Sequence, residues 1–244
     1  MKRTRQPVRN RLLDAMAAGE RKLLAGHLEA FILDRGDVLF EPGQDVIHVY
    51  FPGPGTIAAL LLDLREGATA EAAMIGQEGA VGGVVSDGRK PAFTRGVVQF
   101  AGAAMRLSTD ALESAKLRSP GLRDHLARYA DCLLAQVLQS VACNAVHEFD
   151  ARLARWLLTT QDRIGDRELH MTQEFISEML GVRRTYATRI VGRLEKTGAI
   201  ERSRGMITVM DRGKLERRAC ECYAYLRRHY DRLLPNVYPS FAGR

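Results

Sequence analysis

The sequence predicts an α+β protein in three parts, and three observations support this prediction. Short apolar runs between Gly and Pro turns fill the chain up to about residue 107, which indicates an antiparallel β-roll. A long helical pattern follows, and residues 172–194 then have the pattern of a helix-turn-helix. We place the β-roll at residues 11–118, a long helix at 119–149 and a winged helix-turn-helix at 150–234.

The first part begins with an amphipathic helix, which we expect over residues 11–28. The pattern then changes to short β-type runs separated by turns rich in Gly and Pro. Runs of this length and spacing are typical of an antiparallel sandwich or roll. The expected strands are 31–33, 38–40, 46–51, 57–64, 71–75 and 97–100, with a small helix at 109–117.

Glycines are frequent between residues 76 and 96, where charged side chains also occur. Backbone that lacks side chains can approach a ligand closely, so this segment could form a pocket wall. The other interpretation is a turn-rich corner of the roll, and the sequence does not decide between the two. The candidate effector-pocket residues are Gly76, Glu78, Arg89, Thr94 and Arg95.

The long helix is expected from residue 122 to about residue 148. Its apolar positions alternate in steps of four and three, as in helices that pack along their length. At 1.5 Å per residue it would be ~40 Å long, more than a roll of ~100 residues can cover. We therefore expect a homodimer, although the helix could instead lie on its own roll. The predicted seam is Leu122, Leu126, Tyr129, Leu133, Val137, Val141 and Ala145.

In the helix-turn-helix, Thr172 can cap the first helix and Gly181 can supply the positive φ of the turn. Apolar residues continue along one side of the second helix, and the other side is rich in Arg and Thr. Arginine can grip phosphate or a guanine edge with two parallel bonds. The alternative is an ordinary amphipathic helix pair with a solvated basic face.

The surroundings of this motif favour a winged helix. A helix over residues 151–158 and a polar loop at 161–168 precede it, and short strands at 199–201 and 206–209 follow it. The loop between the two strands carries Arg202 and Arg204, placed to reach backbone phosphates. A final helix is expected over residues 211–234.

The charge distribution supports a nucleic-acid partner. The net charge is +7. Residues 1–150 hold 17 Lys and Arg against 18 Asp and Glu, so the other 19 of 36 basic and 11 of 29 acidic residues follow residue 150. The whole positive excess therefore lies in the part with the helix-turn-helix, as expected when a nucleic-acid-binding domain is joined to a near-neutral one.

Several other classes of protein are not indicated. No apolar run approaches the ~20 residues that span a bilayer, and no apolar segment follows the basic N-terminus. We therefore expect a cytoplasmic protein without membrane contacts. No paired carboxylates, Ser-His-Asp set or phosphate-binding glycine loop occurs, so we expect no enzyme.

The four cysteines are expected to be buried, reduced thiols, and we predict neither a metal nor a cofactor. No CxxC pair occurs, and no histidine follows at zinc-finger spacing. Cys132 and Cys143 should share one face of the long helix. Cys220 and Cys222 should point to different faces of the final helix.

The sequence resembles the Crp/Fnr family of bacterial transcription regulators. The resemblance is strongest in RLARWLL (152–158), in TQEFISEMLGVRRTYATRIVGRLEKTGAI (172–200) and in the RGMITVMDRGKLE that follows, and it is weaker in LDRGDVLFEPGQ (33–44). It implies a roll of the cyclic-nucleotide-binding type, a double-stranded β-helix. It also implies a dimer that binds an inverted repeat of double-stranded DNA, with a recognition helix in each major groove, and RNA polymerase as a partner.

The recognition helix, expected at 183–194, departs from the family pattern at one position. Arg184 and Arg189 match the two family arginines, whereas Thr185 stands where the family commonly has glutamate. A carboxylate accepts a bond from cytosine, and threonine is less specific, so the operator should differ from that of other members. The expected base-reading residues are Arg184, Thr185, Thr188 and Arg189. The expected phosphate contacts are Thr172, Arg183, Arg193, Lys196, Arg202 and Arg204.

The sensor half carries no clear signature, and the effector stays unknown. Nucleotide-binding members have a Gly-Glu pair and a later Arg-Ser or Arg-Thr pair, but here Glu78 is displaced by one and the second pair is missing. No cysteine precedes Cys132, which argues against the N-terminal iron–sulfur cluster of the oxygen-sensing branch. Heme binding through His27 or His48 stays open. The alternative function is a small-molecule- or heme-sensing module whose basic domain contacts proteins.

Overall fold

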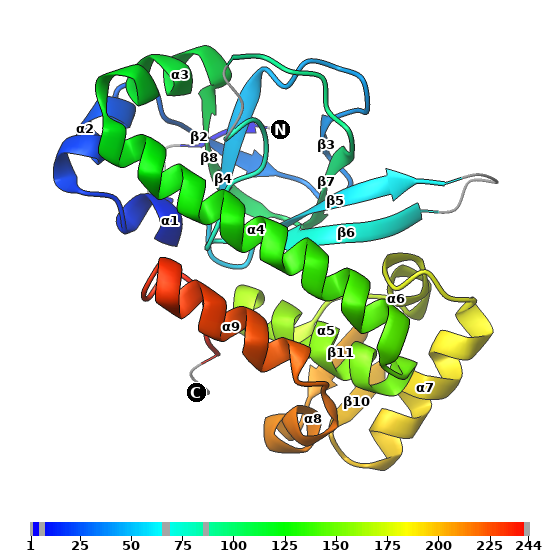
Figure 1. Ribbon diagram of the computed structural model, residues 1–244. Coiled ribbons are helices and arrows are strands. Elements are labelled where there is room, and N and C mark those ends of the chain that lie inside the picture. Colours follow the sequence, from blue (N-terminus) through cyan, green and yellow to red (C-terminus); the bar gives the residue numbers. More distant parts are fainter. Residues whose placement is uncertain (1, 5–7, 65–68, 85–87, 242–244) are drawn as a thin grey trace.

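The computed structural model describes residues 2–4, 8–64, 69–84 and 88–241. A β-roll is joined by one long helix to a second domain, which consists of helices and a small sheet (Figure 1). The predicted α+β class and the predicted order of the parts are confirmed. None of the helices in the described ranges is long and apolar enough to cross a membrane.

The roll consists of two four-stranded antiparallel sheets. The first sheet has the order β1 (Lys2–Arg3), β2 (Glu29–Leu33), β8 (Gly102–Ser108), β4 (His48–Pro52). The second has the order β3 (Val38–Phe40), β7 (Arg95–Phe100), β5 (Ile57–Asp63), β6 (Thr69–Ile75). The sequence prediction missed β8, which pairs with both β2 and β4, because its Gly and Ala residues are poor strand formers.

Two short helices replace the single helix expected at 11–28, and this prediction was wrong. They are α1 (Arg11–Asp14) and α2 (Ala18–Ala25). Asn10 caps α1 by accepting a bond from the Leu13 backbone N–H at 3.0 Å. Glu20 accepts one from the Ala17 N–H at 2.9 Å, which begins a new helix there. The predicted small helix is confirmed as α3 (Thr109–Arg118).

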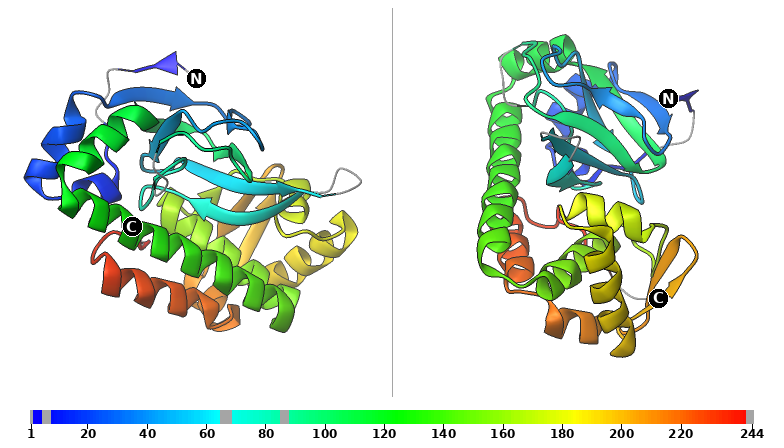
Figure 2. Two further views of the ribbon diagram at one scale, coloured as in Figure 1. Left: turned by 45° about the horizontal axis from the view of Figure 1, so that its top comes forward. Right: turned by 90° about the vertical axis from the view of Figure 1, so that its right-hand side faces the viewer.

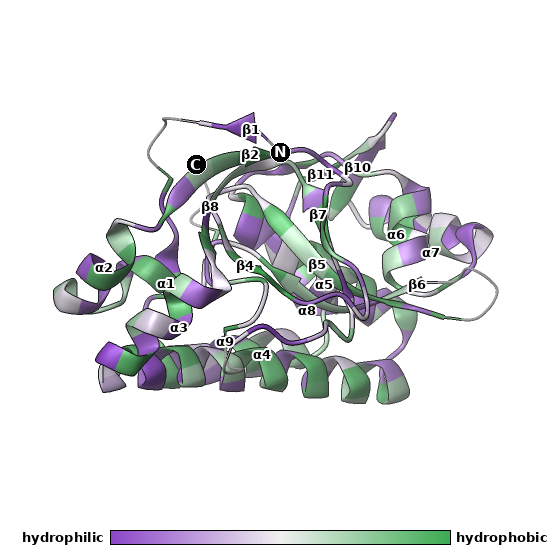
Figure 3. Ribbon diagram, turned by 90° about the horizontal axis from the view of Figure 1, so that it is seen from above, coloured by the Kyte–Doolittle hydropathy of each residue, from purple (hydrophilic) through white to green (hydrophobic). Residues whose placement is uncertain are grey.

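The long helix α4 (Pro120–Val146) connects the roll to the second domain (Figure 2). Ser119 caps it by accepting a bond from the Leu122 N–H at 3.1 Å, and Pro120 occupies the first turn, where a proline fits. Seen from above and coloured by hydropathy, α4 alternates between apolar and polar residues along its length (Figure 3). Helix α9 (Cys222–Leu233) packs along α4.

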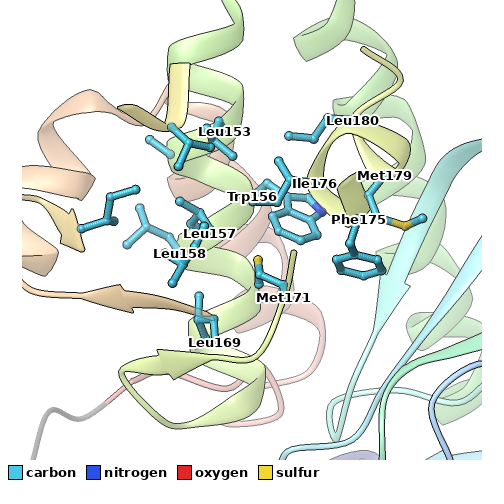
Figure 4. Close-up of a cluster of buried hydrophobic side chains, with 14 of the residues drawn as sticks. Leu153, Trp156, Leu157, Leu158, Leu169, Met171, Phe175, Ile176, Met179 and Leu180 are labelled. Carbon is cyan, nitrogen blue, oxygen red and sulfur yellow. The ribbon is translucent and has the colours of Figure 1, made fainter. Parts of the chain in front are cut away.

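The second domain forms a winged helix-turn-helix. Its other elements are α5 (Phe149–Ile164), β9 (Glu168–Leu169), α6 (Gln173–Met179), α7 (Arg184–Lys196), β10 (Ile200–Ser203), β11 (Met206–Val209) and α8 (Arg212–Arg218). Its core is built on α5, whose Leu153, Trp156 and Leu157 lie beside Phe175 and Ile176 of α6 (Figure 4). Burial of these apolar side chains holds α5 and α6 together.

Two predictions for this domain were wrong. Residues 161–164 of the polar loop expected at 161–168 are instead the last turn of α5, and only residues 165–167 form a loop. The polar residues of this last turn are buried because they have partners: Arg163 Nε lies 2.7 Å from Glu78 Oε1, and Asp162 accepts from Arg212 at 2.9 Å. The final helix is divided into α8 and α9 by residues 219–221.

Candidate nucleic-acid interface

The helix-turn-helix has the cap and the turn that the sequence predicts. The Phe175 N–H donates to Thr172 Oγ1 at 3.1 Å, so Thr172 caps α6. Gly181 has φ of 63°, a left-handed conformation that other residues rarely adopt. The Val182 N–H then donates to the Ser177 carbonyl at 2.9 Å, which closes the turn and sets the start of α7.

Helix α7 has one buried and one exposed face. Its buried face consists of Ala187, Ile190, Val191 and Leu194, which pack into the domain core. The residues predicted to contact DNA that lie exposed on or beside this helix are Arg183, Arg184, Thr185, Arg189, Arg193 and Lys196. Packing on one side thus leaves the basic side of α7 free for a ligand.

The four predicted base-reading residues differ in whether their side chains are exposed to solvent or already bonded within the protein. The Arg184 side chain is 69% exposed, and Arg189 lies over the Tyr186 ring, 5.0 Å from its centroid. Thr185 is exposed at the first turn of α7. The Thr188 hydroxyl, in contrast, donates to Gln173 Oε1 at 2.7 Å and so connects α7 to α6.

Some of the predicted phosphate contacts have acidic partners. Arg202 forms a close ion pair with Glu195, at 2.6 Å, which attaches the wing to α7. Hydrogen bonding by Arg202 also lowers the pKa of the Glu195 carboxyl. Arg193 lies 3.6 Å from Asp150. Arg204, at the tip of the wing, is exposed.

The wing and the helix-turn-helix enclose a common hollow of about 280 Å³. Thr172, Arg184, Arg202 and Arg204 all line it, although they come from three different elements of the domain. Three of them are basic, and the one acidic residue among the lining residues is Glu174, 4.0 Å from Arg184, so basic side chains prevail in this hollow. Such a surface suits the sugar–phosphate backbone of a nucleic acid.

The structure does not bring the five residues predicted for an effector pocket together at one cavity. Gly76 and Glu78 are buried beside Arg163, and the Gly76 N–H donates to Glu78 Oε1 at 3.0 Å. Arg89 pairs with Asp110 at 2.6 Å on the surface. Residues 85–87 of this segment lie outside the described residues.

Arg95 forms ion pairs with Glu41 at 2.7 Å and Asp63 at 3.3 Å, which occupy its guanidinium. Thr94 alone of the five lines the small cavity of the roll, which has about 170 Å³ and mainly apolar walls. Ligand pockets are typically ~300–1,000 Å³, so this cavity is small for a nucleotide or a heme. His27 and His48 are not among its described lining residues.

A larger open cleft of about 830 Å³ lies between the roll and the second domain, and the sequence prediction missed it. Glu71 of β6 lies in this cleft and accepts bonds from Trp156 Nε1 at 3.1 Å and Gln99 Nε2 at 2.7 Å. Burial raises the pKa of the Glu71 carboxyl. The cleft therefore holds a carboxyl that bridges the two halves of the molecule.

The cysteines are all buried, as expected. However, Cys220 and Cys222 do not lie on different faces of one helix, as the sequence predicts. Cys220 precedes the first residue of α9, so it does not share a helix with Cys222, and both contact the same small cluster. Cys132 lies apart from them, among the apolar residues beneath α4. Burial raises the pKa of the Cys132 thiol to about 12.

Comparisons with known proteins agree with this geometry. Residues 151–218 match the family model of the Crp-like helix-turn-helix domain. A putative Crp/Fnr regulator from Eubacterium rectale has a similar structure, with a TM-score of 0.65 and 17% identity, over 85% of this chain and 96% of that one. FixK2 from Bradyrhizobium japonicum gives a TM-score of 0.67 at 14% identity, over 79% and 98%.

A Crp-family regulator from Thermus thermophilus gives a TM-score of 0.64 at 18% identity, over 78% of this chain and 96% of that one. A search of curated protein sequences gave no match. The family model and the exposed basic helix agree in placing a helix-turn-helix domain in the second half of the chain. Residues 151–218 therefore form a Crp-like helix-turn-helix domain, and the chain as a whole has the fold of Crp/Fnr regulators.

Proposed function

We propose that this protein is a homodimer that recognises an inverted repeat in DNA through residues 183–194. The observation that carries the proposal is the two-sided packing of α7. Its apolar side is buried, and its basic side is exposed beside the hollow of the wing. A helix held in this way can enter a major groove while the wing contacts the adjacent backbone.

Arg184 and Arg189 are the proposed readers of guanine edges, because their guanidinium groups lie on the exposed side of α7. Thr185 is free to contact a base or a thymine methyl group. Thr188 has a different role in this proposal, since its hydroxyl is bonded to Gln173 and positions α7 on α6. Arg204 contacts phosphate directly, whereas Arg202 holds the wing through Glu195.

The dimer proposal rests on a free apolar stripe of α4, which only partly matches the predicted seam. Leu122, Leu126 and Tyr129 are buried within the chain's own core, so three of the seven seam residues are already covered. Leu134, Leu138 and Val141 follow at steps of four and three, and they are 55%, 60% and 64% exposed. A stripe with this spacing suits the same helix of a second copy.

A selection from random duplex DNA tests the proposed function. Full-length protein is incubated with the pool, and bound duplexes are amplified and sequenced. We expect an enriched inverted repeat whose half-sites lie about one helical turn apart. A pool without any enriched sequence would contradict the proposal and favour a basic domain that contacts proteins. By family resemblance, the proposal extends to RNA polymerase as a partner and to the cytoplasm as its compartment.

A further inference from the structure

A cluster of four metal-ligating side chains lies at the end of α4. It consists of Cys143, His147, Cys220 and Cys222, whose ligand atoms all lie within 4.8 Å of one another. Cys143 and His147 are four residues apart, so they share one face at the end of α4. Cys220 and Cys222 come from the junction of α8 and α9, which packs against that end.

We infer that these four residues form a Cys₃His site for a single thiolate-binding divalent cation of the Zn²⁺ type. Tetrahedral Zn²⁺ with bonds of ~2.3 Å to sulfur and ~2.0 Å to nitrogen places two sulfurs ~3.8 Å apart, and sulfur and nitrogen ~3.5 Å apart. The Cys143 and Cys220 sulfurs are 3.5 Å apart, and Cys222 Sγ lies 3.6 Å from His147 Nδ1. The cluster is thus nearly preformed for one ion.

The surrounding groups are also those that a metal site needs. The other ring nitrogen of His147, Nε2, lies 3.2 Å from Glu221 Oε1, so a metal on Nδ1 leaves the Nε2–H to donate to the carboxylate. Gln139 Nε2 donates to Cys222 Sγ at 3.0 Å, a bond that suits a thiolate. A carboxylate bonded to the second ring nitrogen, as Glu221 is to His147, orients the histidine and fixes its tautomer.

The charges around the cluster fit a thiolate-rich site. Three thiolates, one neutral imidazole and one divalent cation carry a net charge of −1. Arg152 and Arg155 of α5 lie within electrostatic reach of Cys143, and the Nε atom of each is buried without a hydrogen-bond partner among the described atoms. Binding of the ion releases one proton from each thiol to solvent, which balances the reaction.

The place of the site gives it a mechanical consequence. His147 directly follows the last residue of α4, and α5 begins two residues later, at Phe149. An ion held there ties the connection between the long helix and the DNA-binding domain to the start of α9. Metal binding therefore stabilises this junction, independently of whether the protein binds DNA.

The experiment uses full-length, untagged protein that has been reduced, stripped with a chelator and kept under anaerobic conditions. It is titrated with Co²⁺, whose absorption reports tetrahedral geometry and thiolate ligands, and then with Zn²⁺. We expect one equivalent of Co²⁺ to bind with thiolate-to-metal charge-transfer bands, and Zn²⁺ to displace it. Zn²⁺ should also raise the thermal unfolding midpoint.

Variants locate the ion. Cys143→Ser and His147→Asn should each weaken binding at least ~10-fold and alter the Co²⁺ spectrum, and Glu221→Gln should weaken it by ~10-fold or more. Cys132→Ala is the matched control, because this buried cysteine lies on the same helix outside the cluster. Far-UV circular dichroism checks that each variant folds.

Three results would overturn the inference. One is stoichiometric titration without thiolate-to-metal bands, and another is an unchanged affinity in both Cys143→Ser and His147→Asn. The third is reduced protein that takes up no Co²⁺ or Zn²⁺ and forms only a Cys143–Cys220 disulfide on exposure to air. None of these measurements uses DNA, so they do not depend on the proposed function.

Discussion

At the scale of single residues, Arg184 and Arg204 should contribute to DNA binding in different ways. Arg184 begins α7 and is largely exposed, so we expect it to contact a base edge. Arg184→Ala should cost about 1–3 kcal/mol of binding free energy on the selected repeat, with a smaller loss on random DNA. Fluorescence anisotropy on both duplexes measures this difference. Equal losses on the two duplexes would remove Arg184 from the base-reading set.

Arg204 lies at the exposed tip of the wing, where we expect it to contact phosphate and not a base. Arg204→Ala should weaken binding to all sequences similarly and reduce the slope of log K against log salt by about 1, because one fewer phosphate is neutralised. Anisotropy titrations at several salt concentrations give this slope. An unchanged slope would contradict the assignment.

Arg123 provides a control for both substitutions. It is exposed on the first turns of α4, at the roll end of the molecule, and its removal takes away the same charge. Arg123→Ala should therefore leave both the sequence preference and the salt slope unchanged. A comparable loss in this variant would indicate a general effect of net charge and not a contact.

At the scale of elements, the second half of α4 should form the dimer interface. Leu138 is the centre of the free apolar stripe. Leu138→Asp places two carboxylates in one symmetric interface and should weaken dimerisation by roughly 3 kcal/mol or more. Analytical ultracentrifugation over a range of concentrations measures the shift.

Leu117→Asp is the matched control for the dimer prediction. Leu117 is also an exposed leucine, 82% accessible, but it lies on α3. The Leu117→Asp variant should therefore leave the dimer intact. Equal dissociation of the two variants, or a monomeric parent protein, would rule out the stripe as the interface.

The elements also show what could be predicted from the sequence. The helix-turn-helix was predicted correctly, because Thr172 and Gly181 act locally and the apolar period of α7 is regular. Strand β8 was missed because its strand character comes from its two neighbours and not from its Gly and Ala residues. The residues predicted for an effector pocket lie apart because they form ion pairs with residues distant in the sequence, as Glu78 does with Arg163. No local sequence pattern reveals such pairs.

The cysteine cluster was missed for a similar reason. Its two halves are more than 70 residues apart, and they meet only because α9 packs along α4. A local signal did exist, since Cys143 and His147 have the i,i+4 spacing that puts two ligands on one helical face. The contribution of Cys220 and Cys222 required the tertiary structure.

At the scale of the whole molecule, the roll and the DNA-binding domain contact each other directly. Arg35 of the roll lies over the Phe175 ring of α6 at 4.6 Å, and Trp156 of α5 donates to Glu71 of β6. The buried ion pair between Arg163 and Glu78 joins the same two domains. These contacts connect the roll to the helix-turn-helix, so a change in one domain can bias the position of the other.

Glu71 makes this interface sensitive to pH. Burial raises the pKa of its carboxyl above the ordinary value near 4.5, so the folded protein binds this proton more tightly than the unfolded chain does. The contribution of Glu71 to the free energy of unfolding is therefore present below the ordinary pKa. It is lost as the pH rises through the raised pKa of the folded protein. In Glu71→Gln the amide cannot ionise, and the buried Gln99 Oε1, which has no partner among the described atoms, can turn toward it.

We therefore expect the stability of Glu71→Gln relative to the parent protein to increase with pH from about 4.5 upward, until the folded carboxyl is fully ionised. Urea unfolding of both proteins over a pH series measures this difference. A difference that is independent of pH, or one that decreases as the pH rises, would contradict the assignment of the raised pKa to Glu71.

The central claim is that two copies of α7 read one repeat with a fixed spacing. The most direct measurement compares the affinity of the protein for the selected repeat, for the same repeat with about five base pairs inserted at its centre, and for a single half-site. Half a helical turn puts the second half-site on the opposite side of the duplex. We predict that the insertion lowers the affinity to that of the single half-site. Full affinity for the expanded repeat would contradict the two-fold arrangement.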